Sequence, residues 1–287
     1  MYGGKSLTQS KSTECLVPIS RELSLMLRSN TLPHRRHTSC LQKGLVLIHR
    51  DIELSGEGTG FGVPALRYVD RDYFSGSSTM QTFHDGDRTT VVKKFILDVV
   101  LERNLRGLKS KGKTVRSLVR RLEELYQRHG NWMWLMLKKS LLETFGVETG
   151  FVQVKPVGVV PVVYRMERSR INVKADLSSL KRDGLEKIFL LNEQASSHFR
   201  RYHDSNGSVL FDEKIGPWEN VCAKWASFSN GIGGVGFRLW NVEDAVMHRG
   251  REFLKDTFDW IGLDYEISPE KTSFEYDIEI FGGRKST

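Results

Sequence analysis

Glu57 is a candidate for chemistry because it lies in a run where glycines alternate with other residues, Ser55-Gly56-Glu57-Gly58-Thr59-Gly60-Phe61-Gly62-Val63-Pro64. Glycine has no side chain, so a ligand can approach the backbone of such a run closely. The carboxylate of Glu57 could then act as a catalytic base. Arg67, a few residues further on, could hold an anionic group or a hydroxyl of the ligand. The alternative interpretation is a β-bulge with an exposed acid and a surface arginine.

His198 and Arg200 form a second polar group, just before a strong hairpin turn at 205–208. In a strand over His198–Tyr202 they would share one face, since strand side chains alternate between faces. His198 could then act as an acid or base catalyst, and Arg200 could bind the ligand. The same pair would also fit the solvated face of a sheet.

Trp218 lies in Gly216-Pro217-Trp218-Glu219, a sequence typical of a loop. An aromatic ring on a loop can stack on a ligand such as a sugar, so Trp218 is a candidate ligand-binding residue. The other tryptophans of the C-terminal half would equally suit the core of a large β protein.

The segment 106–121 carries the strongest charge feature, with many lysines and arginines and no acid. Its members Lys109, Lys111, Lys113 and Arg116 lie at the start of a predicted helix. There the helix dipole and the side chains attract an anion together. The segment therefore predicts an anion-binding site, with nucleic acid as a competing ligand, although no nucleic-acid-binding motif accompanies it. A solvated basic loop is the alternative.

The glycine run matches none of the nucleotide-binding motifs. A P-loop would need Gly-Lys-Ser/Thr at its end, and a dinucleotide fingerprint would need glycine where Phe61 or Val63 stands. The run is therefore interpreted as a bent β segment, and no cofactor is predicted. No metal site is predicted either, because Asp85 and Asp87 flank Gly86 as a hairpin turn requires.

Composition favours a soluble globular protein, since 39% of the 287 residues are hydrophobic and 27% are charged. No apolar run approaches the roughly 18 residues that would cross a membrane. Cys15, Cys40 and Cys222 have no metal-ligand spacing, which favours a reducing, cytoplasmic location. The net charge of +8 permits an anionic partner without selecting one.

Residues 41–104 and the chain from 147 onward show short, alternating, strand-like segments separated by turn residues. Residues 114–145 instead have the apolar period of two helices. The predicted organisation is a loosely ordered N-terminal arm over 1–40 and a β-sandwich domain over 41–287, with a helical insertion at about 106–146. A short helix over Ile19–Arg28 is allowed, and Asp244–Trp260 fits a helix or strands.

Part of the glycine run carries a family resemblance. Gly60-Phe61-Gly62-Val63-Pro64, then Tyr68, a turn, and Tyr73-Phe74-Ser75-Gly76-Ser77 resemble early strands of the galactose-mutarotase-like β-sandwich proteins. The alternation Phe274–Ile280 is similar to the closing strand of that group. The resemblance implies a large sandwich and a carbohydrate ligand. The catalytic glutamate and histidine of that group have no matching motif in this chain.

The sequence thus predicts a mainly β protein, a large antiparallel β-sandwich with an inserted helical hairpin. It would bind or act on a sugar or other small anionic ligand on a concave sheet face, with aldose epimerisation as the conceivable reaction. The predicted catalytic residues are Glu57 and His198, and the predicted ligand-binding residues are Arg67, Arg200 and Trp218. One alternative is a non-enzymatic module that binds nucleic acid or another anionic partner through 106–121. A third is an assembly protein whose apolar helix Trp132–Leu142 packs on another subunit.

Overall fold

The computed structural model describes residues 8–10, 13–29, 41–56, 58–69, 71–105, 121, 137, 147–216, 218–230, 234–254 and 258–282. Within these residues the chain is mainly β, as predicted, and the one helical segment longer than a single residue is the 3-10 turn η1 (Asp212–Lys214). Of the predicted helical insertion only Arg121 and Leu137 are described, both helical. The rest of that insertion lies outside the described residues, so the helical hairpin stays a prediction.

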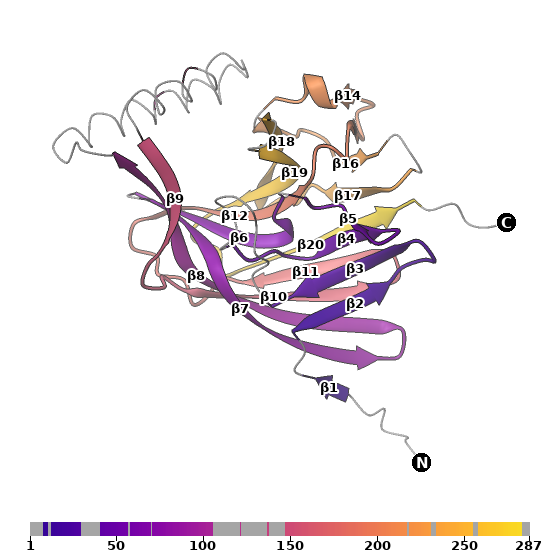
Figure 1. Ribbon diagram of the computed structural model, residues 1–287, viewed down its shortest axis with the longest axis horizontal. Coiled ribbons are helices and arrows are strands. Elements are labelled where there is room, and N and C mark those ends of the chain that lie inside the picture. The colour runs from indigo at the N-terminus through magenta and orange to yellow at the C-terminus, as the bar shows by residue number, and fades with distance from the viewer. Residues whose placement is uncertain are drawn as a thin grey trace.

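An antiparallel sheet of sixteen strands forms most of the fold (Figure 1). We call one half of it the first layer, which contains, in spatial order, β14 (Val209–Phe211), β13 (Arg201–Asp204), β16 (Trp225–Ser229), β17 (Gly236–Trp240), β20 (Ser273–Phe281), β11 (Arg170–Asp176), β10 (Val159–Glu167), β8 (Arg88–Leu105) and β7 (Asp72–Asp85). The second layer continues through β6 (Gly60–Tyr68), β12 (Leu185–Gln194), β19 (Phe258–Ile267), β18 (Ala245–Leu254) and β15 (Glu219–Asn220). Off this path, β1 (Thr8–Ser10) pairs with β7, and β9 (Val147–Gln153) pairs with β8.

A smaller sheet contains β2 (Glu14–Pro18), β3 (Leu23–Arg28), β4 (Val46–His49) and β5 (Ile52–Glu53), in that order. Its strands β2 and β3 lie in the stretch predicted to be a loosely ordered arm. The helix considered over Ile19–Arg28 is wrong, because Leu23, Leu25 and Leu27 recur with the period of a strand and are all buried.

The two layers pack face to face through tyrosines of the first layer. The hydroxyl of Tyr164 on β10 donates to the carbonyl oxygens of Phe61 and Gly62 on β6, at 3.0 Å each. The hydroxyl of Tyr276 on β20 donates to Oδ1 of Asn192 on β12 at 2.6 Å. Because such hydroxyls are costly to bury without partners, these bonds fix how the layers stack. The result is a β-sandwich whose core lies between the layers.

The glycine run is β structure, as predicted, and its glycines fit the crossing of the layers. Gly60 and Gly62 have positive φ values of 79° and 75° within β6. A Cβ atom on Gly62 would lie 2.9 Å from the hydroxyl of Tyr164. The pairing of β6 with β12 also shifts register between Leu191 and Asn192. A side chain at Gly62 would therefore separate the layers.

The hairpin turns follow the sequence pattern. Gly86, with φ of 57°, joins β7 to β8, and Gly207, with φ of 82°, joins β13 to β14. The segment Asp244–Trp260, which was compatible with helix or strand, contains β18 and the start of β19.

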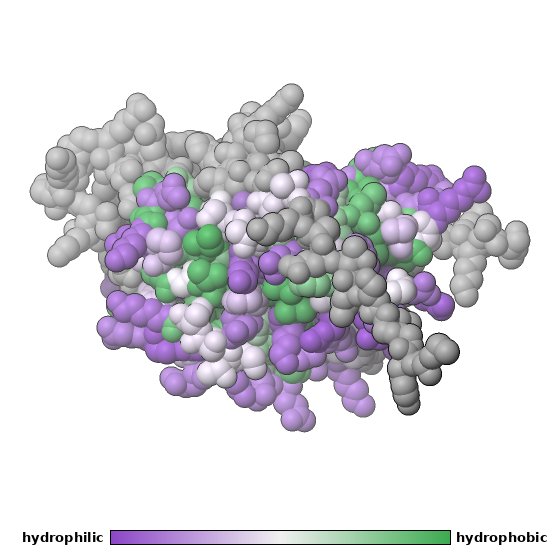
Figure 2. Space-filling model, turned by 90° about the horizontal axis from the view of Figure 1, so that it is seen from below, coloured by the Kyte–Doolittle hydropathy of each residue, from purple (hydrophilic) through white to green (hydrophobic). Residues whose placement is uncertain are grey.

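Exposed apolar side chains are scattered. On the face shown in Figure 2, hydrophobic residues form small groups among hydrophilic ones. The large exposed apolar residues among those described include Leu16, Ile52, Val209, Phe211 and Phe253. In the described part of the chain, no helix has the length and apolar character needed to span a bilayer.

Candidate functional site

The outer face of the second layer brings aromatic side chains together. The ring of Phe189 on β12 lies 6.0 Å from that of Trp218, which immediately precedes β15. Trp218 in turn lies 5.8 Å from Trp260 on β19 and 5.9 Å from His248 on β18. All four side chains are half-buried and so keep part of their surface open. We call Phe189, Trp218, His248 and Trp260 the aromatic face.

Strand register explains why these side chains meet. Trp260 pairs with Glu252, and Gly262 pairs with Gly250 on β18 and with Glu193 on β12. Paired residues of neighbouring strands point to the same face of a sheet. A Cβ on Gly250 would lie 3.2 Å from the Trp260 ring, and a Cβ on Gly262 would lie 3.2 Å from Cγ of Glu193. The two glycines therefore let the indole and the Glu193 side chain lie flat on the backbone.

Glu193 is the most unusual titratable group of this face. Its side chain is buried, and Oε2 accepts a hydrogen bond from the backbone N–H of Thr59, in the glycine run, at 3.3 Å. Burial raises the pKa of Glu193 to about 7, the nearby charge of Glu252 adds to the rise, and the bonds from Thr59 oppose it. Near neutral pH this carboxyl exists in both protonation states, so it can accept or donate a proton.

Asp264 is a second buried acid beside Glu193. Burial raises the pKa of Asp264 well above its usual range, and the charge of Glu193 raises it further. The backbone N–H of Asn192, which donates to Oδ1 of Asp264 at 2.5 Å, opposes this rise. Because two neighbouring buried carboxyls resist ionising together, the pair retains a proton near neutral pH.

His248 adds an imidazole on the strand next to these acids. Its Nε2 lies 3.3 Å from Oε2 of Glu266, whose Oε1 is 2.9 Å from Nζ of Lys187. Burial lowers the pKa of His248, Lys187 lowers it further, and Glu266 partly offsets the fall. Among the described residues, neither of the buried ring nitrogens of His248, Nδ1 and Nε2, has a hydrogen-bond partner of good geometry. A neutral imidazole with a free nitrogen can serve as a donor or as an acceptor.

Two of the predicted ligand-binding residues, Arg67 and Trp218, lie against the same ring. The guanidinium carbon of Arg67 lies 5.7 Å from the centroid of Phe189, on which Trp218 also packs. Arg67 also pairs with both carboxylate oxygens of Asp72, at 2.8 and 3.2 Å. Trp218 has a positive φ of 45°, a conformation that costs an L-residue roughly 1 kcal/mol and is typical of constrained sites. The structure thus places both residues on one face without testing their roles.

His198 and Arg200 do not join that face. The strand begins at Arg201. His198 lies before it in a turn, where its backbone N–H donates to the carbonyl of Ala195 at 3.1 Å. The prediction that His198 and Arg200 share one face of a strand is therefore wrong. Arg200 is exposed, with Nε 3.7 Å from a carboxylate oxygen of Asp212. The local hydrogen bond of the turn takes the place of strand pairing there.

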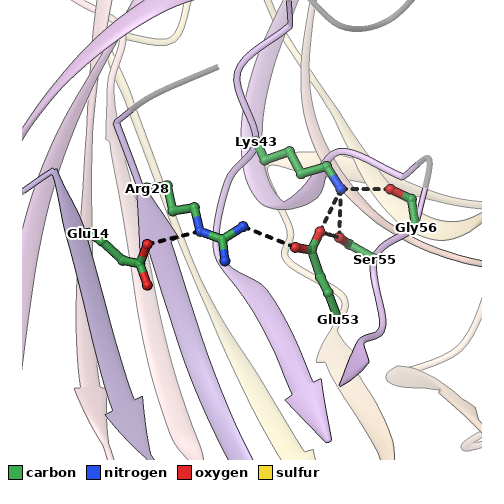
Figure 3. A network of polar contacts seen from close by, with 6 residues as sticks. All are labelled: Glu14, Arg28, Lys43, Glu53, Ser55 and Gly56. Carbon is green, nitrogen blue, oxygen red and sulfur yellow. Dashed lines mark hydrogen bonds and ion pairs between the residues drawn. The ribbon is translucent and has the colours of Figure 1, made fainter. Parts of the chain in front are cut away.

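Glu57 lies outside the described residues, as do Lys109, Lys111, Lys113 and Arg116, so their predicted roles stay predictions. The start of the glycine run next to Glu57 is firmly anchored, however (Figure 3). Nζ of Lys43 donates to Glu53 at 2.6 Å, to Ser55 at 2.9 Å and to the carbonyl of Gly56 at 2.6 Å. These bonds hold the segment from Glu53 to Gly56 in place.

Arg28 on β3 extends this network across the small sheet to Glu14 on β2 (Figure 3). Its guanidinium binds Glu53 at 3.3 Å and Glu14 at 3.2 Å. Burial tends to raise the pKa of Glu53, but the charge and hydrogen bond of Lys43 outweigh it and the net pKa is lowered. Glu53 is therefore a structural anion rather than a proton carrier near neutral pH.

Sequence reasoning missed Glu193, Asp264 and His248. The available signal was the polar run Asn192-Glu193-Gln194, which directly follows the apolar stretch Ile188–Leu191 of one strand. Asp264 similarly interrupts an apolar strand. Among the described residues, no group of three or more His, Cys, Asp or Glu side chains could hold a metal ion.

No family model matches the chain, and no curated protein matches its sequence. Similar solved structures include an α-N-acetylgalactosaminidase from Bifidobacterium bifidum, with a TM-score of 0.49, 8% identity, and coverage of 93% of this chain and 36% of that chain. They also include a glycoside hydrolase family 97 enzyme from Pseudoalteromonas sp. strain K8, with a TM-score of 0.42, 9% identity, and coverage of 93% and 35%. This chain spans about a third of the length of those two proteins.

A candidate aldose 1-epimerase from Escherichia coli K12 is similar along its whole length, with a TM-score of 0.40, 9% identity, and coverage of 94% of this chain and 100% of that one. The sequence resembles galactose-mutarotase-like proteins, and this candidate aldose 1-epimerase is one of the similar structures. At these identities and TM-scores, the likenesses say nothing about activity.

Proposed function

We propose that the protein binds a carbohydrate on the outer face of its second layer, with the aromatic face as the platform for the sugar ring. The observation that carries this proposal is the place of Trp218, whose ring centroid lies 5.8 Å from that of Trp260 and 5.9 Å from that of His248, beside the buried acid Glu193. Indole rings pack on the apolar C–H face of a sugar. Carboxyl and imidazole groups bind its hydroxyls.

Arg67 lies at one edge of this platform and is proposed to hold a hydroxyl or an anionic substituent. Its guanidinium already contacts Phe189 and Asp72, which fix its direction. Glu57, whose position the structure does not describe, and His198, which lies in the turn after Ala195, stay predicted catalytic residues from the sequence, as an alternative to the pair proposed below.

The reaction proposed for this site is interconversion of the anomers of an aldose. Ring opening removes the proton of the anomeric hydroxyl and delivers a proton to the ring oxygen, and closure on the other face of the carbonyl reverses both transfers. Glu193 is proposed as the base, because its pKa of about 7 leaves part of it ionised near neutral pH. The protonated form of His248, which the neighbouring Glu266 favours, is proposed to supply the second proton, and the resulting neutral imidazole recovers a proton on closure.

The binding proposal is tested by titrating the protein with D-galactose and D-glucose while recording tryptophan fluorescence. A saturable change is expected, and Trp218→Ala should weaken binding by roughly tenfold because it removes half of the stacking surface. Trp225→Ala is the matched control, since Trp225 lies on the first layer against Arg238. No saturable response to either sugar, or equal losses in both variants, would contradict the proposal.

The catalytic part is tested separately by polarimetry of freshly dissolved α-D-glucose and α-D-galactose. The wild type should accelerate the approach to the equilibrium rotation, and Glu193→Gln should lose about a hundredfold or more of that acceleration. If the wild type binds the sugar but the optical rotation changes no faster than in buffer alone, the catalytic proposal is refuted and the binding proposal stands.

A further inference from the structure

A hollow lies on the outer face of the first layer, away from the aromatic face. Its volume is about 510 Å³, within the range of small-molecule sites. It extends over strands β8, β10, β11, β20 and β17, and it is lined by Arg88, Arg165, Glu167, Arg170, Asn172, Trp240, Asp277 and Ile278. We call this hollow the arginine groove.

Strand register places the polar residues of the groove side by side. Arg88 pairs with Glu167, which pairs in turn with Arg170. Cross-strand ion pairs of this kind are common on solvated sheet faces, and Arg88 does bind Glu167 at 2.9 Å. Such a ladder explains these two residues but does not explain the hollow itself.

Arg170 is an uncommitted cation. It is exposed, and its guanidinium makes no ion pair or hydrogen bond with the described residues. Nη1 of the neighbouring Arg165 donates to Oδ1 of Asn172 at 2.9 Å and lies 3.7 Å from Oε1 of Glu275. A guanidinium with free donors matches the paired oxygens of a carboxylate or a phosphate. Arg170 therefore offers the groove an oxyanion contact.

Trp240 supplies the apolar wall. Its side chain is half-buried and lines the hollow, and its backbone carbonyl accepts a hydrogen bond from the hydroxyl of Tyr265 at 2.5 Å. On the floor nearby, Nδ2 of Asn172 donates to Oδ1 of Asp277 at 2.9 Å. Asp277 is exposed and keeps acceptor capacity that could bind hydroxyls.

We propose that the arginine groove is a second ligand site, for a sugar that carries a carboxylate or a phosphate. Arg170 binds the charged group, Trp240 stacks on the ring, and Asp277 accepts from the ring hydroxyls. A flat aromatic wall, acceptors for hydroxyls and a free guanidinium in one hollow match this ligand better than a bare anion. This site goes beyond the sugar site of the aromatic face and does not depend on it.

Calorimetric titration of the full chain with D-glucuronate, D-glucose 6-phosphate, neutral D-glucose and inorganic phosphate tests the proposal. At least one charged sugar should bind, and Arg170→Gln should weaken that binding about tenfold, as expected for a charge-assisted contact. Arg168→Gln is the matched control, because Arg168 is an exposed arginine in the adjacent turn that does not line the groove. It should leave the affinity unchanged.

Other outcomes have clear meanings. No binding of either charged sugar, or equal weakening by both arginine variants, would overturn the proposal. Inorganic phosphate that binds as tightly as glucose 6-phosphate, with no effect of Trp240→Ala, would overturn the sugar part. If Trp218→Ala abolishes binding of the charged sugar and Arg170→Gln does not, that sugar binds at the aromatic face instead. If Arg170→Gln weakens binding of the charged sugar and Trp218→Ala leaves it unchanged, the arginine groove is a separate site.

Discussion

Glu193 links function and stability through a single carboxyl. Its pKa is about 7 in the folded chain and near the ordinary glutamate value when unfolded, so the folded state binds more protons between these pH values. The free energy of unfolding should therefore fall as pH rises from about 4.5 to 7, by up to about 3 kcal/mol. Glu193→Gln should make this fall smaller, and the part that remains belongs to Asp264, whose pKa is also raised by burial. Urea unfolding at pH 5 and pH 8 checks it, and equal pH dependence in both proteins would contradict the assigned environment.

Lys93 gives a residue-scale prediction of the opposite sign. It is fully buried on β8, its Nζ donates to the carbonyls of Arg28 and Lys43, and burial lowers its pKa to about 7. The unfolded chain therefore binds more protons than the folded chain above pH 7, and stability should rise with pH from about 7 to 10. Relative to Lys93→Met, the wild type should gain stability over this range. Chemical unfolding at pH 7 and pH 9.5 measures this gain. The same pH dependence of stability in the wild type and in Lys93→Met would refute the lowered pKa of Lys93.

At the scale of elements, β6 needs glycine at position 62 because the side chain of Tyr164, from the facing layer, packs against the backbone there. Gly62→Ala would place Cβ 2.9 Å from the Tyr164 hydroxyl at a φ of 75°, so it should destabilise the fold by about 3 kcal/mol or more. Gly86→Ala is the control, since its φ is 57° but no atom lies within 4 Å of the added methyl. It should cost only about 1 kcal/mol. Similar losses of Tm in both variants would show that backbone strain alone, and not the layer crossing, requires glycine at position 62.

The strands themselves were largely predictable, because period-two alternation and turn residues such as Gly86 and Gly207 are local signals. The β2–β3 pair was missed because Leu23, Leu25 and Leu27 sit in a short, polar-flanked stretch. The acids of the site were missed for a different reason. Glu193 becomes unusual only when β6 and β19 bury it, and burial by distant strands leaves little trace in the local sequence.

At the scale of the whole molecule, the sandwich presents two outer faces with different characters. The second layer carries indoles and buried acids, and the first layer carries the arginine groove with Trp240. The hydroxyls of Tyr164 and Tyr276 donate hydrogen bonds from the first layer to the second. These bonds hold the two layers rigidly together behind each outer face. We expect ligand binding on one face to leave the affinity of the other face unchanged, which titration of each ligand in the presence of the other would measure. A mutual change in affinity of about fivefold or more would instead show coupling between the faces.

The central claim is that the aromatic face holds a neutral sugar ring. The most direct measurement is a crystal structure of the chain with D-galactose or D-glucose bound. We expect the sugar ring to stack on Trp218 or Trp260, with a hydroxyl within hydrogen-bond distance of Glu193 or His248. A sugar bound elsewhere, with these side chains untouched, would contradict it.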